Sequence, residues 1–329
     1  MTKTISVFNN KGGVGKTSIL WNLGVSLADK NQKVLILDFD PQCNLSIAML
    51  GDKKFAELLH TTEEYPYGQT VKSFVLPYIQ RNEKKLPFKQ VPKFLSPTMT
   101  GRLDIIAGDF WLNTFSDTLT VGNDVISGTG LYRFLTPELL KEQLTDIDYD
   151  YVLIDLPPSF NTLVRSALYC SDYFIVPCTP DLFSAYCVSL IGEMLPRFVE
   201  DWEQGKKRYL ETDPNDTLIQ NKGKPKFGGW IFNGFDTRKG SEVGADKALL
   251  KDIEDAIQNK LIPSLKNNIK NYDAIPNFIF TAPIAKIEDL NVMAPDSIYQ
   301  NIPIKNIYLS INLRGNFVGR ALGHQIKLI

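Results

Sequence analysis

A glycine-rich segment near the start of the chain has the residue types needed to bind phosphate. It reads Asn10-Lys-Gly-Gly-Val-Gly-Lys-Thr17 and follows a short apolar run. Glycines let backbone N–H groups turn toward an anion, and the N-terminus of a following helix adds positive potential. Lys16 is placed to reach the β- and γ-phosphates of a nucleotide, and the Thr17 hydroxyl to reach Mg²⁺. The segment predicts a phosphate loop, although Asn10 stands where the usual pattern G-x-x-x-x-G-K-[ST] has glycine.

A second lysine lies inside the same loop. Lys11 stands five residues before Lys16, so two ammonium groups share one small region. Like charges this close repel one another unless an anion faces them. We therefore expect Lys11 also to face a phosphate-bearing ligand; a solvated lysine on the loop is the alternative.

Carboxylates follow two apolar segments that are predicted to be strands. The run 34–37 ends in Asp38-Phe-Asp-Pro-Gln42, and the run 151–154 is closed by Asp155 before two prolines. Ligand sites in open α/β sheets lie at the carboxyl ends of the strands, so these aspartates are expected to point at the phosphate loop. An aspartate at position 155 would hold Mg²⁺ mostly through water.

These three motifs, taken in chain order, resemble those of the ParA/MinD family of P-loop ATPases. The run Lys11-Gly-Gly-Val-Gly-Lys-Thr-Ser18 is similar to the family's deviant Walker A loop, Asp38-Phe-Asp-Pro41 to its second signature and Asp155-Leu-Pro-Pro158 to its Walker B strand end. The resemblance covers most of residues 3–50, 101–198 and 228–303 and is closest to the ParA/Soj partition branch. It implies an ATP hydrolase with ATP and Mg²⁺ as cofactors.

The resemblance also implies roles for single residues. Lys11, Lys16 and Asp40 are the expected catalytic residues. Lys11 would reach across a dimer interface to the partner's nucleotide, much as an arginine finger does, and Asp40 would position or activate the attacking water. Around Mg²⁺ the expected residues are Thr17, Asp38 and Asp155. The expected nucleotide-binding residues are Gly12, Gly13, Val14, Gly15, Lys16, Thr17, Ser18 and Asn233.

Asn233 ends the apolar segment 229–232 and, by the same resemblance, contacts the base. An amide can both donate to and accept from the edge of adenine, so the residue type suits that contact. The alternative is an ordinary asparagine in a turn at the end of a strand.

Alternating strand and helix patterns predict the elements that position these residues. Short apolar runs predict strands at 5–8, 34–37, 103–106, 151–154, 173–176, 229–232 and 278–281. Helical spacing predicts helices at 17–28, 131–144, 162–170 and 184–198. This alternation predicts a doubly wound α/β fold, with a mostly parallel sheet flanked by helices, and the resemblance makes it a P-loop NTPase of SIMIBI/ParA-like type. The stretches at about 51–100 and 200–226 break the rhythm and are expected to be insertions on one domain spanning 1–329, since each is too small to bury a core alone.

The composition excludes several other kinds of protein. In 329 residues, 36 Lys and Arg face 37 Asp and Glu, so a histone-like polyanion binder is excluded while a local basic patch is not. The four cysteines form no C-x-x-C pair, which argues against zinc and iron–sulfur sites. No stretch approaches the roughly 18 apolar residues of a membrane helix. A cytoplasmic protein, associated with the nucleoid if it binds DNA, is expected.

The sequence says less about whether such an ATPase would bind DNA or a membrane. Basic residues favour DNA, bound without sequence preference through its phosphates; they are Arg238, Lys239, Lys305, Arg314, Arg320, Lys327 and the lysines of 206–226. The resemblance implies a homodimer on ATP binding, a task in plasmid or chromosome partition and a small DNA-binding partner that stimulates hydrolysis. The alternatives are a MinD-like membrane-associated ATPase, for which the segment 317–329 is weakly amphipathic, a scaffold or positioning ATPase, and a low-turnover regulatory nucleotide switch.

Overall fold

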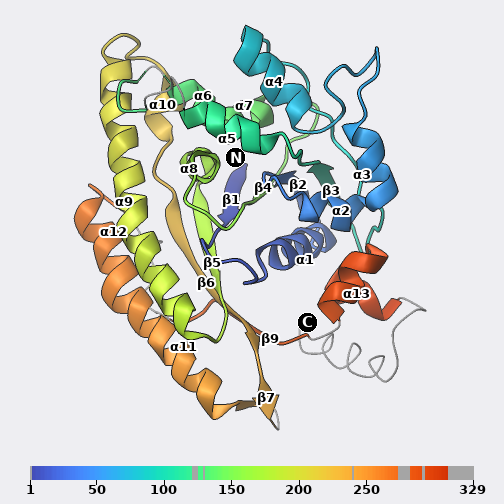
Figure 1. The fold of residues 1–329 in the computed structure, drawn as a ribbon, viewed down its shortest axis with the longest axis vertical. Coiled ribbons are helices and arrows are strands. Elements are labelled where there is room, and N and C mark those ends of the chain that lie inside the picture. Colours follow the sequence, from blue (N-terminus) through green and yellow to red (C-terminus); the bar gives the residue numbers. More distant parts are fainter. Residues whose placement is uncertain are drawn as a thin grey trace.

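One parallel sheet forms the centre of the molecule (Figure 1). The computed structural model describes residues 2–120, 125–128, 130–238, 241–272, 282–290 and 293–309. Its seven-stranded sheet has the order β3-β2-β4-β1-β5-β6-β9, and every pair is parallel. The strands are β1 Lys3–Val7, β2 Lys33–Asp38, β3 Arg102–Ile106, β4 Tyr151–Asp155, β5 Tyr173–Cys178, β6 Lys226–Phe235 and β9 Ala285–Glu288. The predicted doubly wound α/β fold is confirmed.

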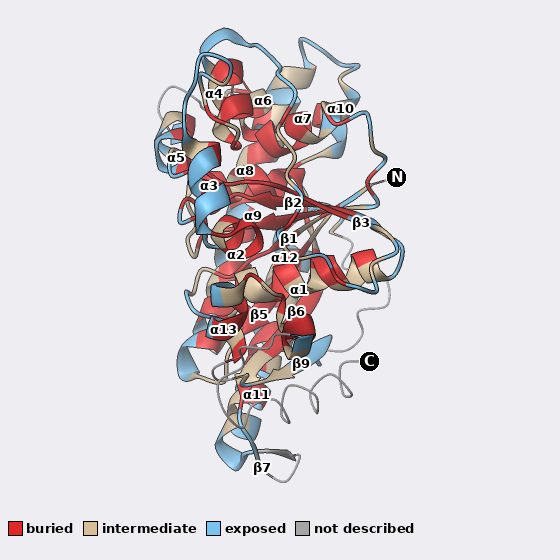
Figure 2. Cartoon of the chain, turned by 90° about the vertical axis from the view of Figure 1, so that its right-hand side faces the viewer, coloured by how far each residue is buried: buried red, intermediate tan, exposed pale blue. Residues whose placement is uncertain are grey.

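Helices cover both faces of this sheet, so the strands are the most buried part of the protein (Figure 2). In chain order they are α1 Lys16–Asp29, α2 Asn44–Leu50, α3 Asp52–Leu59, α4 Lys72–Arg81, α5 Leu112–Thr120, α6 Leu131–Phe134, α7 Thr136–Glu142, α8 Thr162–Cys170, α9 Leu182–Leu210, α10 Thr217–Asn221, α11 Gly244–Ala256, α12 Ile262–Asn268 and α13 Met293–Gln300. A π-helical turn Ile257–Leu261 joins α11 to α12, a 3-10 turn Ile304–Leu309 follows α13, and a small hairpin pairs β7 Thr237–Arg238 with β8 Ser241–Glu242.

Alternate residues of the central strands enter two separate hydrophobic cores. In β2, Val34 and Ile36 pack with α1 and α2, while Leu35 and Leu37 pack with α5 and α8 on the other face. Successive side chains of a strand point to opposite faces, so a strand buried on both faces is apolar throughout. Gly24 lets α1 lie close to the sheet, because a Cβ there would meet Ile36 Cδ1 at 2.9 Å. This packing fixes α1, and with it the loop that precedes it, against the sheet.

Two helices differ from their predicted bounds. The helix predicted at 131–144 is interrupted at Leu135, and a new helix starts with Pro137 in its first turn. Proline lacks the N–H of a helix interior and clashes with the carbonyl four residues earlier, so the chain restarts there. The helix predicted at 184–198 runs on to Leu210, deep into the stretch expected to be an insertion, because Trp202 is fully buried against Tyr169. The strand predicted at 278–281 lies outside the described residues.

Among the described residues, α9 is the one helix long and apolar enough, by length and composition, to cross a membrane. Half of its most apolar window is buried inside the protein. Its buried side chains, such as Ile191 and Leu195, belong to the larger of the two hydrophobic cores, and the helix packs against α11 and α12. These contacts are those of a core helix in a folded domain.

Candidate functional site

The glycine-rich segment forms a tight loop between β1 and α1, at the carboxyl edge of the sheet. Gly13 and Gly15 have φ of +73° and +85°, values in the left-handed region that favours glycine. A Cβ on Gly15 would also lie 2.5 Å from Asn233 Nδ2, so the Asn233 amide would have to move. The loop therefore needs glycine for its turn, and Gly15 leaves room for the Asn233 side chain.

Both lysines of the loop are held by groups of the protein. Lys16 is almost fully buried, and its ammonium donates to the Lys11 carbonyl oxygen over 3.0 Å. Burial lowers the pKa of Lys16, while the charges of Asp155 and Asp40 oppose that shift. Lys11 forms an ion pair with Asp181 and donates to Thr179 Oγ1 at 2.8 Å. The two ammonium groups thus point in different directions from one loop.

Asp155 is almost fully buried and is hydrogen-bonded to Thr17 at the start of α1. The Thr17 hydroxyl donates to Asp155 Oδ2 over 2.8 Å, and the other carboxylate oxygen is buried without a hydrogen-bond partner. Burial, followed by the charge of Asp38, raises the pKa of Asp155 to about 8. An unpartnered buried carboxylate oxygen beside a threonine hydroxyl suits a hard cation that prefers oxygen ligands. The residues present fit Mg²⁺.

Asp38 lies next to Asp155 in the sheet but makes a different set of contacts. Its Oδ2 accepts from the Ser46 N–H at 2.9 Å and the Ser46 hydroxyl at 2.5 Å, and its Oδ1 accepts from the Asp40 N–H at 3.2 Å. Burial raises the pKa of Asp38 to about 6 despite these hydrogen bonds. The Ser46 hydroxyl also accepts from the Gly108 N–H at 2.8 Å. Asp38 thereby ties α2 and the segment after β3 to the end of β2, two residues before Asp40.

Asp40 is the acid of this group that lines the open cavity beside the loop. That cavity has a volume of about 440 Å³ and is also lined by Gly12, Gly13, Gly15, Lys16 and Thr17. The Gln42 N–H donates to Asp40 Oδ1 over 2.9 Å, which fixes the carboxylate at the cavity wall. Burial raises the pKa of Asp40, and its hydrogen bond from Gln42 and the charge of Lys16 act against that shift.

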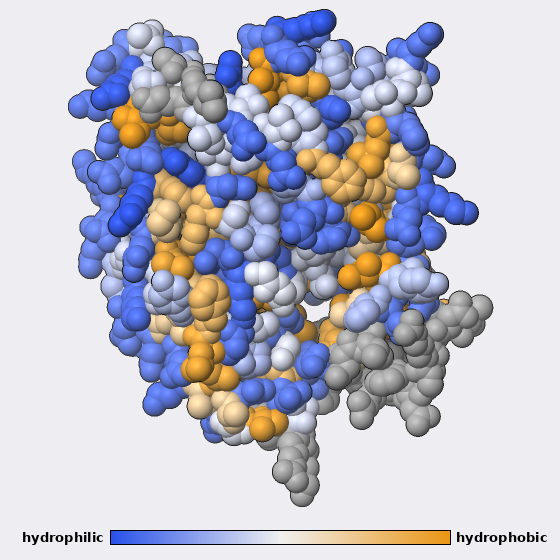
Figure 3. Space-filling view, viewed as in Figure 1, coloured by the Kyte–Doolittle hydropathy of each residue, from blue (hydrophilic) through white to orange (hydrophobic). Residues whose placement is uncertain are grey.

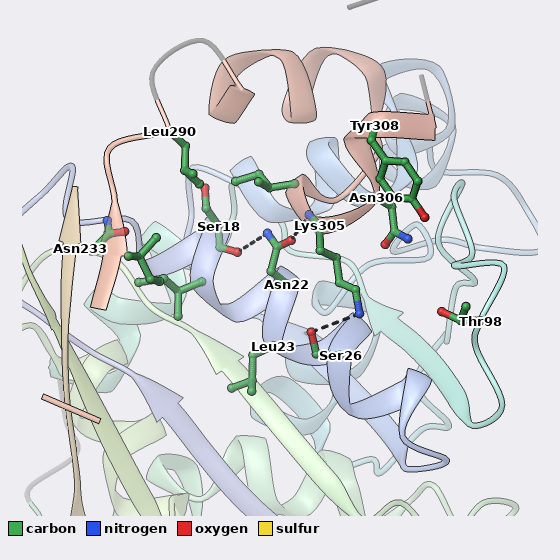
Figure 4. Close-up of a pocket in the computed structure, with 13 residues that line it drawn as sticks. Ser18, Asn22, Leu23, Ser26, Thr98, Asn233, Leu290, Lys305, Asn306 and Tyr308 are labelled. Carbon is green, nitrogen blue, oxygen red and sulfur yellow. Dashed lines mark hydrogen bonds between the residues drawn. The ribbon is translucent and has the colours of Figure 1, made fainter. Parts of the chain in front are cut away.

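A second cavity, also of about 440 Å³, adjoins the first along α1 (Figure 4). The two share Ser18, Asn233, Leu290 and Ile304 in their walls. The lining of this second cavity is mostly apolar. Asn233 lies where the cavities meet, and its amide N–H donates to the Val14 carbonyl oxygen over 3.1 Å. A ligand with phosphates at the loop and a flat apolar group beyond Asn233 matches this pair of cavities in shape and polarity.

The predicted site residues thus come together at one edge of the sheet. Asp40, Asn233 and most loop residues line the cavities directly, namely Gly12, Gly13, Gly15, Lys16, Thr17 and Ser18. Val14, Asp38 and Asp155 are buried and line neither cavity, and Lys11 contacts Asp181 instead. The residues that contact Lys11, namely Thr179, Asp181 and Ser184, were not predicted to do so. The wall formed by 288–290, at the end of β9, was not predicted either. The run Pro177-Cys-Thr-Pro-Asp181, which begins in the last residues of β5, is the sequence signal for the residues that contact Lys11, and residues 288–290 carry no motif.

Several basic residues predicted to form a DNA surface are paired within the chain. The pairs are Lys206–Glu203, Lys224–Glu203, Lys222–Glu138 and Lys305–Asp29. Arg208 donates to the Ile126 carbonyl oxygen over 2.9 Å. Lys239, Arg314, Arg320, Lys327 and the segment 317–329 lie outside the described residues. Three of the six cations in 206–226, Lys206, Lys222 and Lys224, are therefore partly neutralised by nearby acids.

Comparison with known proteins gives matches over the same part of the chain as the site. A profile of the family described as AAA domain matches residues 2–206. A ParA family protein from Chlamydia pneumoniae is 31% identical over 185 residues, which are 55% of this chain and 60% of that protein. The chain spans about 60 to 66% of the length of the first curated relatives that it matches.

Solved structures with the same fold include two nucleotide complexes. McdA from Cyanothece bound to ATP superposes with a TM-score of 0.57 and 16% identity, over 98% of this chain and 96% of that one. A plasmid partition protein from Borrelia burgdorferi bound to AMPPNP gives 0.53 and 18% identity over the full length of both. At such identities these likenesses concern the fold alone.

Proposed function

Because the chain belongs to the ParA/MinD-type family of P-loop ATPases, we propose that it is an ATP hydrolase that acts as a dimerising switch in DNA partition. The observation that carries the proposal is the convergence of Lys16, Thr17, Asp40 and Asp155 at the carboxyl edge of the sheet, around a cavity of about 440 Å³. A phosphate loop, a cavity-lining carboxylate and a desolvated carboxylate–hydroxyl pair are the parts that phosphoryl transfer needs.

The triphosphate of ATP would occupy the cavity beside the loop. Lys16 would leave the Lys11 carbonyl for the β- and γ-phosphates, which are better acceptors for a buried ammonium than a neutral carbonyl. Backbone N–H groups of 12–18 would donate to the remaining phosphate oxygens. The base would lie beside Asn233, in the apolar cavity along α1.

Thr17, with Asp155 behind it, would hold Mg²⁺, and Asp38 is expected close to the same shell. When bound, Mg²⁺ would neutralise charge on the phosphates. Binding would also favour the ionised form of Asp155, which burial disfavours in the ligand-free chain. Asp40 would accept a hydrogen bond from the attacking water and orient it toward the γ-phosphate. Its position in the cavity wall and its fixation by Gln42 support that assignment.

Lys11 would act in trans, on the nucleotide of a second copy. The proposed cycle has an ATP-bound dimer that binds DNA without sequence preference and separates after hydrolysis, which a small DNA-binding partner stimulates. ParA-named relatives support this reading. The DNA contacts would come from cations other than the paired lysines of 206–226, since an ammonium engaged by a carboxylate gives up part of its attraction for phosphate. We propose a cytoplasmic location and one domain, with 51–100 and part of 200–226 as additions to its core.

Two measurements test this function together. Mg²⁺-dependent release of phosphate from ATP should be slow in the purified chain and abolished in Lys16→Ala. Binding to duplex DNA of unrelated sequences should require ATP and weaken steeply with salt, because each phosphate contact releases counterions. Sedimentation with anionic liposomes is the control for a membrane-associated ATPase. ATP-dependent liposome binding without DNA binding would contradict the partition proposal.

A further inference from the structure

The ammonium group of Lys11 is held by the start of α9 in its own chain. It forms an ion pair with Asp181, donates to Thr179 Oγ1 over 2.8 Å and lies 3.5 Å from Ser184 Oγ. These three acceptors come from a single turn of chain after β5. The loop that binds phosphate is therefore fastened to a 29-residue helix by one side chain.

Asp181 uses its two oxygens for two separate purposes. Oδ1 accepts from the N–H groups of Phe183 and Ser184, both at 3.0 Å, and so caps α9. Oδ2 accepts from Lys11 and, over 2.6 Å, from the Thr179 hydroxyl. Burial alone would raise the pKa of Asp181, but its hydrogen bonds from Lys11, Thr179 and Ser184 together with the charge of Lys11 outweigh burial and lower it. Because the helix cap uses Oδ1 and the ion pair uses Oδ2, a substitution that changes only Oδ2 can remove the ion pair and keep the cap.

This contact lies where another molecule can reach it. The side chains of Lys11 and Asp181 are 20% and 37% exposed. The next residues, Leu182 and Phe183, are among the more exposed large apolar side chains of the described chain, and apolar surface gathers over this end of α9 (Figure 3). An ion pair this accessible is screened by water and is weak enough to be exchanged for a better anion.

We propose that Asp181 is a positioning residue that retains Lys11 on its own chain until a second, nucleotide-bound copy offers a phosphate in exchange. The inference rests on the proposed ATP-dependent dimer. A terminal phosphate carries more negative charge than one carboxylate and has several acceptor oxygens, so it can displace Asp181 from the ammonium group. Each dimer would open two such contacts, one in each chain, and their loss would oppose dimerisation.

Asp181→Asn separates the ion pair from the helix cap. Asparagine is as good an N-cap as aspartate, so its side-chain oxygen can keep the hydrogen bonds to Phe183 and Ser184. Its NH₂ group then faces the Lys11 ammonium, and two donors do not attract. We expect the ATP-bound dimer of Asp181→Asn to form about tenfold more tightly than that of wild type in sedimentation velocity. Tenfold corresponds to about 1.4 kcal/mol, shared by two partly exposed ion pairs.

Two controls separate this effect from a change in the fold. Asp216 caps α10 by accepting from the Ile219 N–H at 2.9 Å, so Asp216→Asn is the matched cap variant and should leave dimerisation unchanged. Lys11→Ala should be monomeric with ATP, and Asp181→Asn should not restore a dimer in that background, because there is no ammonium to release. An ATP-dependent dimer of the double variant would overturn the proposal.

An independent readout needs neither ATP nor a dimer. Lys11 should react slowly with an amine-labelling reagent in the nucleotide-free chain, with the exposed Lys30 as internal reference, and several-fold faster in Asp181→Asn. An unchanged rate would overturn the proposal. If the wild-type chain never dimerises with ATP, the proposed function is refuted. The proposed exchange of Asp181 for a phosphate of the second copy is then refuted as well. A wild-type dimer that Asp181→Asn fails to tighten would refute the retention of Lys11 alone.

Discussion

Replacing Asp155 by asparagine should stabilise the nucleotide-free protein, and the gain should grow with pH. Burial and the charge of Asp38 raise the pKa of Asp155 from 3.8 to about 8. Between these two values the folded state binds more protons than the unfolded state, so the free energy of unfolding of wild type falls as pH rises. Asparagine keeps the size of the side chain without the buried charge, which removes this pH dependence.

The size of the effect follows from the shift. The value of pH 7 lies roughly three units above the unfolded pKa of Asp155, and at 1.36 kcal/mol per unit the part of the shift that is felt at this pH would cost about 4 kcal/mol. Asp38 repels the same charge and shares that cost, so we expect Asp155→Asn to gain about 2 kcal/mol at pH 7 and about 1 kcal/mol at pH 5. For a chain of this size the gain at pH 7 is an upward shift of Tm by about 3 °C.

Chemical denaturation at pH 5, 7 and 8 measures this prediction directly. The control is Asp104→Asn: Asp104 is buried too, but it pairs with Arg102 and accepts from the Tyr149 hydroxyl at 2.6 Å, so its removal should destabilise. Addition of Mg²⁺ and ATP should reverse the order of wild type and Asp155→Asn, because the variant lacks the charge for the cation. A loss of stability in Asp155→Asn of the same size at all three pH values would refute the reasoning.

Three further substitutions test other parts of the site and the core. Lys16→Ala should weaken ATP binding about 100-fold in calorimetry, because a buried ammonium–phosphate contact is lost, and wild-type affinity would exclude the phosphate loop. Asn233→Ala should weaken ATP binding about fivefold and GTP binding less, as expected for one hydrogen bond to the base, and equal losses would exclude that contact. Gly205→Ala should lower the free energy of unfolding by about 2 kcal/mol, since its Cβ would lie 1.7 Å from the Val125 carbonyl oxygen. Gly244→Ala is the control, because a Cβ there meets no atom within 4 Å and should cost little stability. Equal effects of the two substitutions would contradict the packing of α9.

The sheet and the phosphate loop could be predicted from the sequence because both depend on local patterns. Each strand of the centre is a short apolar run, and the loop is specified by glycines whose left-handed φ values the structure contains. The break at Leu135 also has a local signal, since Pro137 stands in the middle of the predicted helix. The apolar spacing around Pro137 is helical nonetheless, and it favours one continuous helix.

Long-range contacts could not be read from the sequence. The retention of Lys11 joins residues 170 positions apart, and nothing in the sequence around either one indicates the other. The continuation of α9 to Leu210 depends on the packing of Trp202 against Tyr169 in the core. This tertiary contact outweighs the polar composition of the last part of the helix. The ion pair of Lys222 with Glu138 likewise lowers the net positive charge of a cluster that the sequence predicts to bind DNA.

The central claim is that ATP converts this chain from a monomer into a dimer. Asp40→Ala should bind ATP without hydrolysing it, because the loop and Lys16 are intact while the residue that orients water is gone. Sedimentation velocity of this variant at micromolar concentration should show a dimer with Mg²⁺ and ATP, a monomer with ADP, and a monomer when Lys11→Ala is added. A monomer of Asp40→Ala under saturating ATP would contradict the account.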